Sequence, residues 1–186
     1  MSIAYQIHKQ DGTYFLTPTI INWIDIFIRD RYKQILTDRL NHCVDNFGLE
    51  IYAYVIMPSH FHMIAGSRNN NLSSVIGKLK EISSKMIVLE LKKSNESRKE
   101  WILPMLLEAG LKNSRNKNYQ LWQQNNHAEE IWSSKFMLSK IKYIHNNPLE
   151  EGFVDRAEDY LYSSAKDYAG KKSPVKVTPI ELHSLF

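Results

Sequence analysis

The stretch from residue 50 to residue 66 constrains the fold most, because its pattern predicts two adjacent strands joined by a tight turn. Residues 50–57 (Glu-Ile-Tyr-Ala-Tyr-Val-Ile-Met) are rich in aromatic and β-branched side chains, which favour strands. Pro58 and Ser59 then form a short turn, and residues 60–66 (His-Phe-His-Met-Ile-Ala-Gly) return as a second strand. We therefore expect an antiparallel strand pair here.

Segments with helical periodicity flank this strand pair. Apolar residues recur at helical spacing from about residue 27 to residue 47, and Gly48 is a plausible stop for that helix. A second apolar stripe runs along residues 72–92 and predicts another long helix. Two amphipathic helices of this kind can both cover one face of a sheet.

Weaker patterns complete the order of elements. Residues 13–17 predict a first strand, and residues 119–123 predict a fourth. A third helix is expected to start at Ser133 or Ser134, either of which can cap it, and to end before Pro148. The order β-α-β-β-α-β-α predicts an α+β fold of ferredoxin-like type, an antiparallel sheet with two helices on one face. The other sheet face is then free for a site, and the late helix can lie over it.

Length and composition indicate one globular domain. The chain has 186 residues, of which 43% are hydrophobic and 24% charged, so the pattern of disordered proteins is absent. The single cysteine, Cys43, excludes an internal disulfide framework and a cysteine-rich zinc site. We expect one domain over residues 1–170, with a basic insertion or long loop at about 92–118, and a basic C-terminal tail over 171–186.

The sequence also suggests where the protein works. We find no signal peptide and no long uncharged apolar run, so we expect a cytoplasmic protein that does not enter a membrane. The net charge of +4 and the pI of about 9.0 fit a nucleic-acid partner, although many basic proteins bind none.

His60 and His62 are the first candidates for chemistry. Successive side chains of a strand point to opposite faces, so both imidazoles point one way, and Phe61, Met63 and Ala65 point towards the helices. Two neutral imidazoles on one face are well placed to share a divalent cation, with a third ligand coming from elsewhere. Since His-x-His also arises by chance, the pair alone does not decide the matter.

Tyr143 is the second candidate, in the run Tyr-Ile-His-Asn-Asn-Pro at the end of the third predicted helix. Tyr143 and Asn147 are four residues apart, so both side chains can point into one site. A phenol is a poor nucleophile at neutral pH, and a nearby metal would help by polarising a target phosphate. Asn147 is a candidate third metal ligand, whereas His145 lies on a different helix face and ranks lower. The alternative for Tyr143 is a half-buried helix aromatic.

Two of these runs together resemble the HUH single-tyrosine transposases, and within them the IS200-like, REP-associated tyrosine transposase branch. The runs are Val-Ile-Met-Pro-Ser-His-Phe-His-Met-Ile at 55–64 and Tyr-Ile-His-Asn-Asn-Pro-Leu-Glu-Glu-Gly-Phe-Val at 143–154. A weaker third run is Tyr-Leu-Tyr-Ser-Ser-Ala at 160–165. The order and spacing match over roughly residues 12–168, and the two main motifs are specific only in combination.

The resemblance implies a ferredoxin-like domain with a Mg²⁺ or Mn²⁺ site that cuts and rejoins single-stranded DNA. It implies that the tyrosine attacks a DNA phosphate, which leaves a 5′-phosphotyrosine link and a free 3′-hydroxyl. Carried over by position, His60 and His62 match the metal pair, Tyr143 the nucleophile and Asn147 a polar metal ligand. The expected partner is single-stranded DNA or a DNA hairpin, and a homodimer is left open.

The chain departs from the family pattern in two places. The segment 92–118 looks long and basic for the core family, and residues 17–22 (Thr-Pro-Thr-Ile-Ile-Asn) stand where we expect a more polar, arginine-bearing run. This puts DNA contacts by the first strand in doubt. Candidate DNA-binding residues are instead Lys78, Lys85, Lys92, Lys93, Arg98 and Lys140, although lysine stripes are more often solvated helix faces.

Other functions remain open from the sequence. A single-stranded nucleic-acid binding module could stack bases on Tyr52 and Tyr54 without cutting them. A zinc hydrolase lacks a third strong ligand at a suitable spacing. A domesticated relative could use the same fold for DNA binding or regulation alone. Should Tyr143 not be the nucleophile, the next candidates are Tyr119, Tyr160 and Tyr162.

Overall fold

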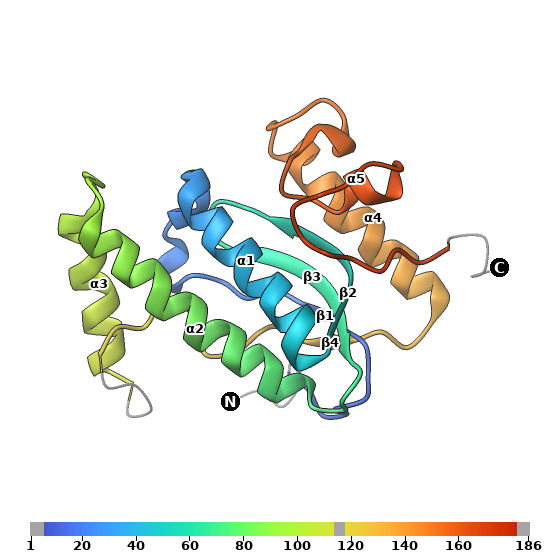
Figure 1. The fold of residues 1–186 in the computed structure, drawn as a ribbon, viewed down its shortest axis with the longest axis horizontal. Coiled ribbons are helices and arrows are strands. Elements are labelled where there is room, and N and C mark those ends of the chain that lie inside the picture. Colours follow the sequence, from blue (N-terminus) through green and yellow to red (C-terminus); the bar gives the residue numbers. More distant parts are fainter. Residues whose placement is uncertain (1–5, 114–117, 182–186) are drawn as a thin grey trace.

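The computed structural model describes residues 6–113 and 118–181 (Figure 1). The strands are β1 (Tyr14–Leu16), β2 (Leu49–Ile56), β3 (Phe61–Ser67) and β4 (Glu129–Glu130). The α-helices are α1 (Asp30–Phe47), α2 (Leu72–Lys93), α3 (Lys99–Leu111), α4 (Ser134–Glu150) and α5 (Ala165–Tyr168). The short 3₁₀ helices are η2 (Ile21–Trp23), η3 (Ile26–Ile28) and η4 (Ala157–Asp159). Within the described residues, no helix combines the length and apolarity needed to cross a membrane.

The four strands form one antiparallel sheet in the order β2-β3-β1-β4. This is the strand order of a ferredoxin-like sheet, with β3 and β1 in the middle. Helices α1 and α2 lie together on one side of the sheet, and α4 lies on the other side (Figure 1). The predicted α+β class, with two helices on one face and a late helix over the other, is confirmed.

Alternation along β3 divides its side chains between two hydrophobic cores. Phe61, Met63 and Ala65 are buried in the larger core with α1 and α2. Ile64 belongs to the smaller core on the opposite face, which includes Ile141 of α4. The predicted separation of the odd-numbered side chains from the even-numbered ones is therefore correct.

Gly48 ends α1 as predicted. Its φ of 71° lies in the left-handed region, and its N–H bonds to the carbonyl of Cys43. A Cβ atom at this position would come within 2.7 Å of Asn69 Nδ2, so glycine suits both the conformation and the space. Cys43 itself is buried at 1% exposure, as a small hydrophobic residue.

The predicted strand at 119–123 is wrong, because the fourth strand is β4 and pairs with β1. The 119–123 segment instead passes under α3, where the Gln120 N–H bonds to the carbonyl of Leu106. It meets the sheet region through an isolated bridge between Ile20 and Trp122, and the Trp122 ring lies edge-on to Phe61 of β3 at 5.5 Å. Its apolar residues Leu121 and Trp122 are buried in the larger core without joining the strand ladder.

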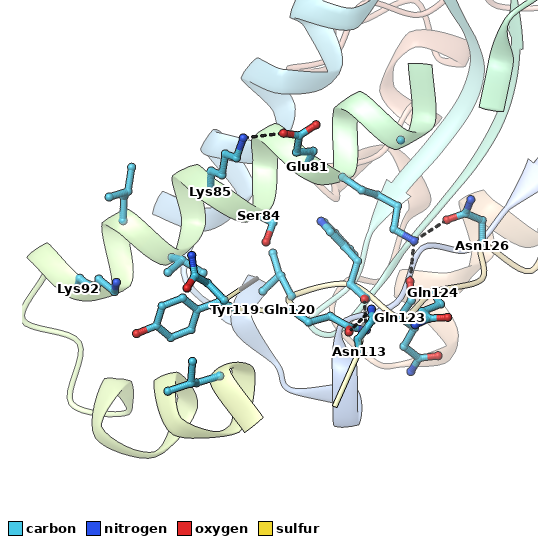
Figure 2. Close-up of a pocket in the computed structure, with 18 of the residues that line it drawn as sticks. Glu81, Ser84, Lys85, Lys92, Asn113, Tyr119, Gln120, Gln123, Gln124 and Asn126 are labelled. Atoms are coloured by element: carbon cyan, nitrogen blue, oxygen red, sulfur yellow. Dashed lines mark hydrogen bonds and ion pairs between the residues drawn. The ribbon is translucent and has the colours of Figure 1, made fainter. Parts of the chain in front are cut away.

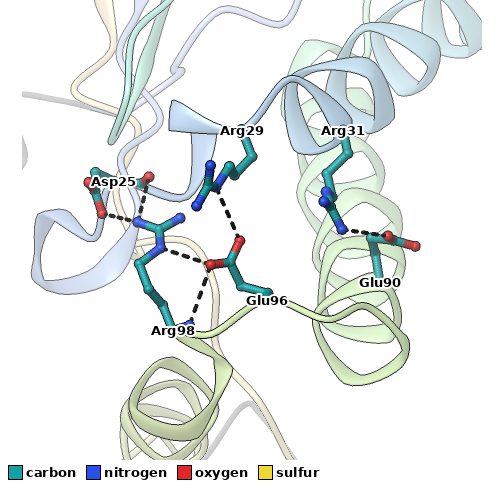
Figure 3. Close-up of polar contacts among 6 residues, drawn as sticks. All are labelled: Asp25, Arg29, Arg31, Glu90, Glu96 and Arg98. Atoms are coloured by element: carbon teal, nitrogen blue, oxygen red, sulfur yellow. Dashed lines mark hydrogen bonds and ion pairs between the residues drawn. The ribbon is translucent and has the colours of Figure 1, made fainter.

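The predicted long loop at 92–118 is also wrong in part, because its middle forms α3. Four charged side chains fix the start of this helix (Figure 3). Arg98 Nη1 lies 2.7 Å from Asp25 Oδ1, and Arg98 Nε lies 3.1 Å from Glu96 Oε1. Arg29 Nε approaches the other Glu96 oxygen at 3.6 Å. The network ties α3 to the segment that precedes α1.

Replacing Glu96 with glutamine is expected to lower the free energy of unfolding by about 2 kcal/mol, because the partly buried Arg98 guanidinium loses one of its two carboxylate partners and keeps only Asp25. Burial raises the pKa of the Glu96 carboxyl, but the hydrogen bonds and charges of Arg98, with the charge of Arg29, outweigh it and hold the pKa below 4.5. A lowered carboxyl pKa stabilises the fold above pH 4.5, and this contribution is lost as the pH falls through the folded-state value.

Urea unfolding at neutral and acid pH measures both effects. Glu90→Gln is the matched control, since Glu90 is more exposed and lies 3.8 Å from Arg31. The difference between wild type and Glu96→Gln should narrow as the pH falls. Equal stability of the two variants at neutral pH would contradict this role of Glu96.

Helix α4 continues past Pro148, where we expected it to have ended. Pro148 lies in the last turn, so it removes one helical hydrogen bond near an end where few remain. Its own carbonyl still accepts the N–H of Phe153 at 2.9 Å. The helix ends only at Glu150.

The described part of the predicted basic tail packs against the domain. Val175 is buried, Lys176 Nζ lies 2.7 Å from Asp45 Oδ2, and the Thr178 N–H bonds to the carbonyl of Ile51. Residues 171–181 thus lie along α1 and β2, while residues 182–186 fall outside the described chain. The domain boundary at 170 stays a prediction.

Candidate active site

The candidate site lies on the sheet face that α4 covers. Ser133 begins the helix, since its side chain accepts the N–H of Phe136 at 3.2 Å. Ile141 and Ile144 then pack onto Phe15 and Val55 in the smaller core. This packing orients the neighbouring face of α4, which carries Tyr143, towards β3.

The two histidines face each other across the start of β3. His60 Nε2 and His62 Nε2 are 3.1 Å apart. The other ring nitrogens meet hydroxyl groups, because His60 Nδ1 lies 3.2 Å from Ser59 Oγ and His62 Nδ1 lies 2.9 Å from Thr17 Oγ1. Hydroxyl partners of this kind orient metal-binding imidazoles.

Burial keeps both imidazoles in the form that binds metals. It lowers the pKa of His60 to about 4. Burial, followed by the charges of His60 and Lys140, lowers the pKa of His62 to about 3. Both rings are therefore neutral at pH 7, and a neutral imidazole offers a lone pair to a cation.

Tyr143 completes the group. Its Oη lies 3.5 Å from His62 Nε2, and the two ring centroids are 5.1 Å apart. Phe15 stacks on His62 at 5.4 Å and meets the Tyr143 ring edge-on at 5.9 Å. Tyr143 as a whole is 42% exposed, so the residue is accessible from solvent while its ring is held by Phe15 and His62.

Lys140 is the predicted DNA-binding residue that lies beside this group. Its Nζ lies 4.2 Å from the centroid of the Phe15 ring and 3.0 Å from Glu129 Oε1. The Lys140 side chain is only 18% exposed, so its cation is partly screened from water. A positive charge therefore borders the histidine and tyrosine rings.

Asn147 and His145 follow Tyr143 on α4, but their side chains lie in different surroundings. Asn147 is buried at 7% exposure, one turn beyond Tyr143, and its role as a metal ligand stays a prediction. His145 Nε2 lies 2.9 Å from Ser164 Oγ, which also accepts the N–H of Tyr54 at 2.9 Å. His145 thus joins α4 to the segment that runs along β2, which is a structural role.

The other predicted DNA-binding residues lie on α2 and at the start of α3, on the opposite side of the sheet. Lys78 Nζ sits 4.4 Å above the Phe47 ring, and Lys85 Nζ lies 2.6 Å from Glu81 Oε1. Lys93 is exposed at the end of α2. Arg98 belongs to the ion-pair network with Glu96, so its donors serve the fold. None of these residues is brought to the histidine pair.

An open groove, the α2 groove, runs along the same side of the sheet as these lysines, between α2, α3 and residues 118–126 (Figure 2). Its volume is about 1230 Å³, and Lys85 and Lys92 are among the residues that line it. Lys80 also lines the groove, and its Nζ donates to the Gln123 carbonyl at 2.6 Å and to Asn126 Oδ1 at 2.8 Å. Burial lowers the pKa of Lys80 to about 8.

The base-stacking alternative finds less support in the structure. Tyr54 is fully buried in the larger core, so it cannot stack a base, and Tyr52 is half-buried beside Glu50. Across the residues described, no group of three or more His, Cys, Asp or Glu side chains comes together as a metal site.

Several residues of the site were missed from the sequence. Phe15 and Thr17 reach His62 only because β1 pairs with β3, and local periodicity carries no signal for that pairing. Trp23 meets the His60 ring edge-on at 5.6 Å, although it lies on a separate 3₁₀ turn. Ser59 was visible as the neighbour of His60, but its contact with Nδ1 was not.

Comparison with known proteins connects this site to a family. The model of the family described as "Transposase IS200 like" matches residues 22–102, which include His60 and His62. A curated protein of Haemophilus influenzae, provisionally named a REP-associated tyrosine transposase, is 26% identical over 162 residues. The match covers 82% of this chain and 79% of that protein. This chain is similar to the IS200-like transposases. The predicted resemblance is thereby confirmed.

A solved structure shares the fold of this chain. It is described as a REP-associated tyrosine transposase bound to a REP hairpin. The two chains superpose with a TM-score of 0.64 at 22% identity, over 97% of this chain and 94% of the other. The shared fold spans α4 and Tyr143, which lie beyond the segment that the family model matches.

Proposed function

We propose that this protein cleaves and rejoins single-stranded DNA, with Tyr143 as the nucleophile. One observation carries the proposal, the approach of Tyr143 Oη to 3.5 Å from an imidazole nitrogen of the facing histidine pair. Helix α4 and strand β3 are far apart in the sequence, and a purely structural helix aromatic has no need of that neighbour. The relatives described above are transposases, which agrees with such chemistry.

The proposed reaction exchanges one phosphodiester for another. A bond forms between Tyr143 Oη and the DNA phosphorus, and the bond from phosphorus to the 3′-oxygen breaks. The phenol loses a proton and the departing 3′-oxygen gains one, so the step needs no co-reactant. The product is a 5′-phosphotyrosine link with a free 3′-hydroxyl, and attack by a 3′-hydroxyl reverses it. The energy of the broken bond is conserved for rejoining.

The histidine pair fits a divalent cation, and the transposase family is generally metal-dependent. Two ligand atoms about 2.1 Å from one ion and at right angles are about 3.0 Å apart, and the Nε2 atoms are 3.1 Å apart. We propose that His60 and His62 hold Mg²⁺ or Mn²⁺, with Asn147 as a third ligand. A bound cation supplies positive charge to the scissile phosphate.

The proposed substrate is single-stranded DNA or a DNA hairpin with single-stranded flanks. The solved relative with this fold is described as bound to a REP hairpin. In this proposal Lys140, whose Nζ lies over the Phe15 ring, would meet a phosphate beside Tyr143. Lys85 and Lys92 line the α2 groove, and together with Lys78 and Lys93 they would contact phosphates further from the cut. Cytoplasmic localisation and a homodimer remain part of the proposal.

A covalent-adduct assay tests the proposed function. The protein is incubated with a pool of DNA hairpins carrying single-stranded flanks, with Mn²⁺, and is analysed on a denaturing gel. We expect a protein band that carries DNA and that depends on the metal. A protein that binds the pool but forms no adduct, at any divalent metal offered, would instead be a binding or regulatory relative.

Thr17→Val is expected to weaken Mn²⁺ binding by about 10- to 100-fold, because an outer-shell partner that orients a ligating histidine contributes about that much. The Thr17 hydroxyl lies 2.9 Å from His62 Nδ1, and valine keeps its shape without the hydroxyl. Thr17→Ser is the control, since serine retains the hydroxyl and should bind Mn²⁺ nearly as wild type. Equal affinities of the valine and serine variants by calorimetry would show that Thr17 does not orient a metal ligand.

A further inference from the structure

We propose that two exposed tryptophans, Trp23 and Trp132, stack on bases at either end of a single-strand track that passes over Tyr143. The inference rests on the proposed function and adds how the strand is held. The two indoles lie at opposite ends of a run of ring and cation contacts that includes His60 and Lys140.

Trp23 marks the histidine end of the track. Its side chain is 61% exposed, although the large apolar residues around it are buried. The indole meets the His60 ring edge-on, with the centroids 5.6 Å apart. A base stacked on Trp23 would therefore lie beside the proposed metal ligands. Aromatic side chains that bind single strands use such exposed faces.

The backbone beneath Trp23 is strained. Asn22 and Trp23 have φ values of 52° and 54°, in the left-handed region that a bulky residue such as tryptophan rarely adopts. Ile20, Ile21 and Ile24 are buried on either side, and they hold the turn in place. Strain of this kind persists where the surrounding structure imposes it, and it is common at functional sites.

The neighbouring backbone contacts explain how the strain is maintained. The Ile20 N–H bonds to the carbonyl of Ser59, next to His60, at 2.9 Å. The Ile21 N–H bonds to the carbonyl of Leu121 at 2.9 Å. Backbone hydrogen bonds thus anchor the turn to Ser59, next to His60, and to Leu121 in the segment that passes under α3. The result is an exposed indole at a fixed place beside His60.

Trp132 marks the other end, just before α4. It is 76% exposed and stacks on Phe136, with centroids 5.6 Å apart and an interplanar angle of 19°. Lys140 Nζ lies 5.1 Å from the Phe136 ring and 4.2 Å from the Phe15 ring. Phe15 in turn touches the rings of Tyr143 and His62. Ring contacts, bridged by the Lys140 cation between Phe136 and Phe15, therefore continue from Trp132 to Tyr143.

The alternation of aromatic faces with a lysine cation favours a nucleic-acid strand as the occupant. Bases stack on aromatic rings whatever their sequence. Lys140 lies between the rings, where its Nζ also pairs with Glu129 at 3.0 Å, and a phosphate that joins two bases would compete with that carboxylate for the cation. The track is also continuous with the proposed reacting group. An exposed aromatic patch without this cation and this continuity would fit a protein partner equally well.

The first test measures DNA affinity in the Tyr143→Phe background, in which no covalent step can interfere. The probe is a DNA hairpin with single-stranded thymidine flanks, titrated by fluorescence anisotropy. Trp23→Ala and Trp132→Ala should each weaken binding by about 5- to 100-fold, the usual effect of removing one stacked base contact. Trp23→Phe and Trp132→Phe should recover most of the affinity, because phenylalanine keeps a ring face.

Trp101→Ala is the matched control, because Trp101 is also exposed, at 45%, but lies on α3 away from the track. It should bind the probe as the Tyr143→Phe parent does. Affinities of Trp23→Ala and Trp132→Ala equal to that of Trp101→Ala would overturn the proposal. Such a result would leave the adduct assay unaffected, so the failure of the track and the failure of the cleavage function are distinguishable.

A second variant separates a binding role from a structural one. Trp23→Gly removes the indole and also relieves the left-handed backbone, so its melting temperature should be at or above that of wild type. Its DNA affinity should fall as far as that of Trp23→Ala. A clear drop in melting temperature with unchanged DNA affinity would show that Trp23 serves the fold and not a base.

Discussion

Tyr143→Phe is expected to abolish the covalent protein–DNA adduct, with at least a ~10³-fold loss of cleavage, since loss of a nucleophile has effects of that order. The substitution removes only the hydroxyl. The ring contacts with Phe15 and His62 do not need that oxygen, so the fold and the DNA affinity should stay close to wild type. Denaturing gels with a substrate labelled on the 3′ side of the cut measure the adduct directly.

Tyr119→Phe is the matched control for this prediction. Tyr119 is also a partly exposed tyrosine, but it lies in the α2 groove, where Lys92 Nζ is 4.4 Å from its ring centroid. The Tyr119→Phe variant should form the adduct at the wild-type rate. A shifted band that persists in Tyr143→Phe would show that the nucleophile has been misassigned.

Replacing His60 and His62 together with alanine is expected to lower cleavage by at least ~10²-fold and to remove tight Mn²⁺ binding, because both proposed imidazole ligands are lost. The two Nε2 atoms are 3.1 Å apart, and each imidazole would supply one nitrogen ligand to a shared ion. Calorimetric titration with Mn²⁺ reports the binding, and the adduct assay reports the cleavage.

His42→Ala controls for the loss of a histidine elsewhere. His42 lies on α1, where its Nδ1 is 3.1 Å from Asn46 Nδ2, far in the fold from the sheet face that carries the site. This variant should bind Mn²⁺ and cleave DNA as wild type does. A double variant of His60 and His62 that cleaves at the wild-type rate would contradict the assignment of the pair.

Local sequence patterns predicted most of the fold, but they missed strand β4 and helix α3. The strand pair and helices α1 and α2 follow from periodicities that run over many residues. Their predicted bounds were therefore within a few residues of those in the structure. Strand β4 has two residues, too few to show any period, and the 119–123 segment imitates a strand while packing under a helix. Helix α3 has a consecutive apolar run and an internal Pro104, which hide its helical period.

The site was predictable to different degrees for different residues. The shared orientation of His60 and His62 is a local consequence of strand alternation. The meeting of Tyr143 with His62 depends on how α4 crosses the sheet, and only the resemblance to transposases pointed to it. Trp23 was missed because its exposure and its strained backbone appear only in the folded chain.

The lysine predictions illustrate a limit of helix-face reasoning. The spacing of Lys78, Lys85 and Lys92 correctly places them along α2, but it does not say on which side of the sheet α2 lies. The fold puts α2 and α4 on opposite sides of the sheet, so these lysines lie away from the histidine pair. Lys140, predicted by its helix face alone, is the one that joins the site.

Identification of the residue that carries the DNA tests the central claim most directly. Wild-type protein is allowed to react with a hairpin pool and Mn²⁺, the adduct is digested with protease and nuclease, and the modified peptide is sequenced by mass spectrometry. We predict a nucleotide joined through its 5′-phosphate to Tyr143. Attachment to any other residue, or cut DNA with a free 5′-phosphate and no modified peptide, would contradict the proposed mechanism.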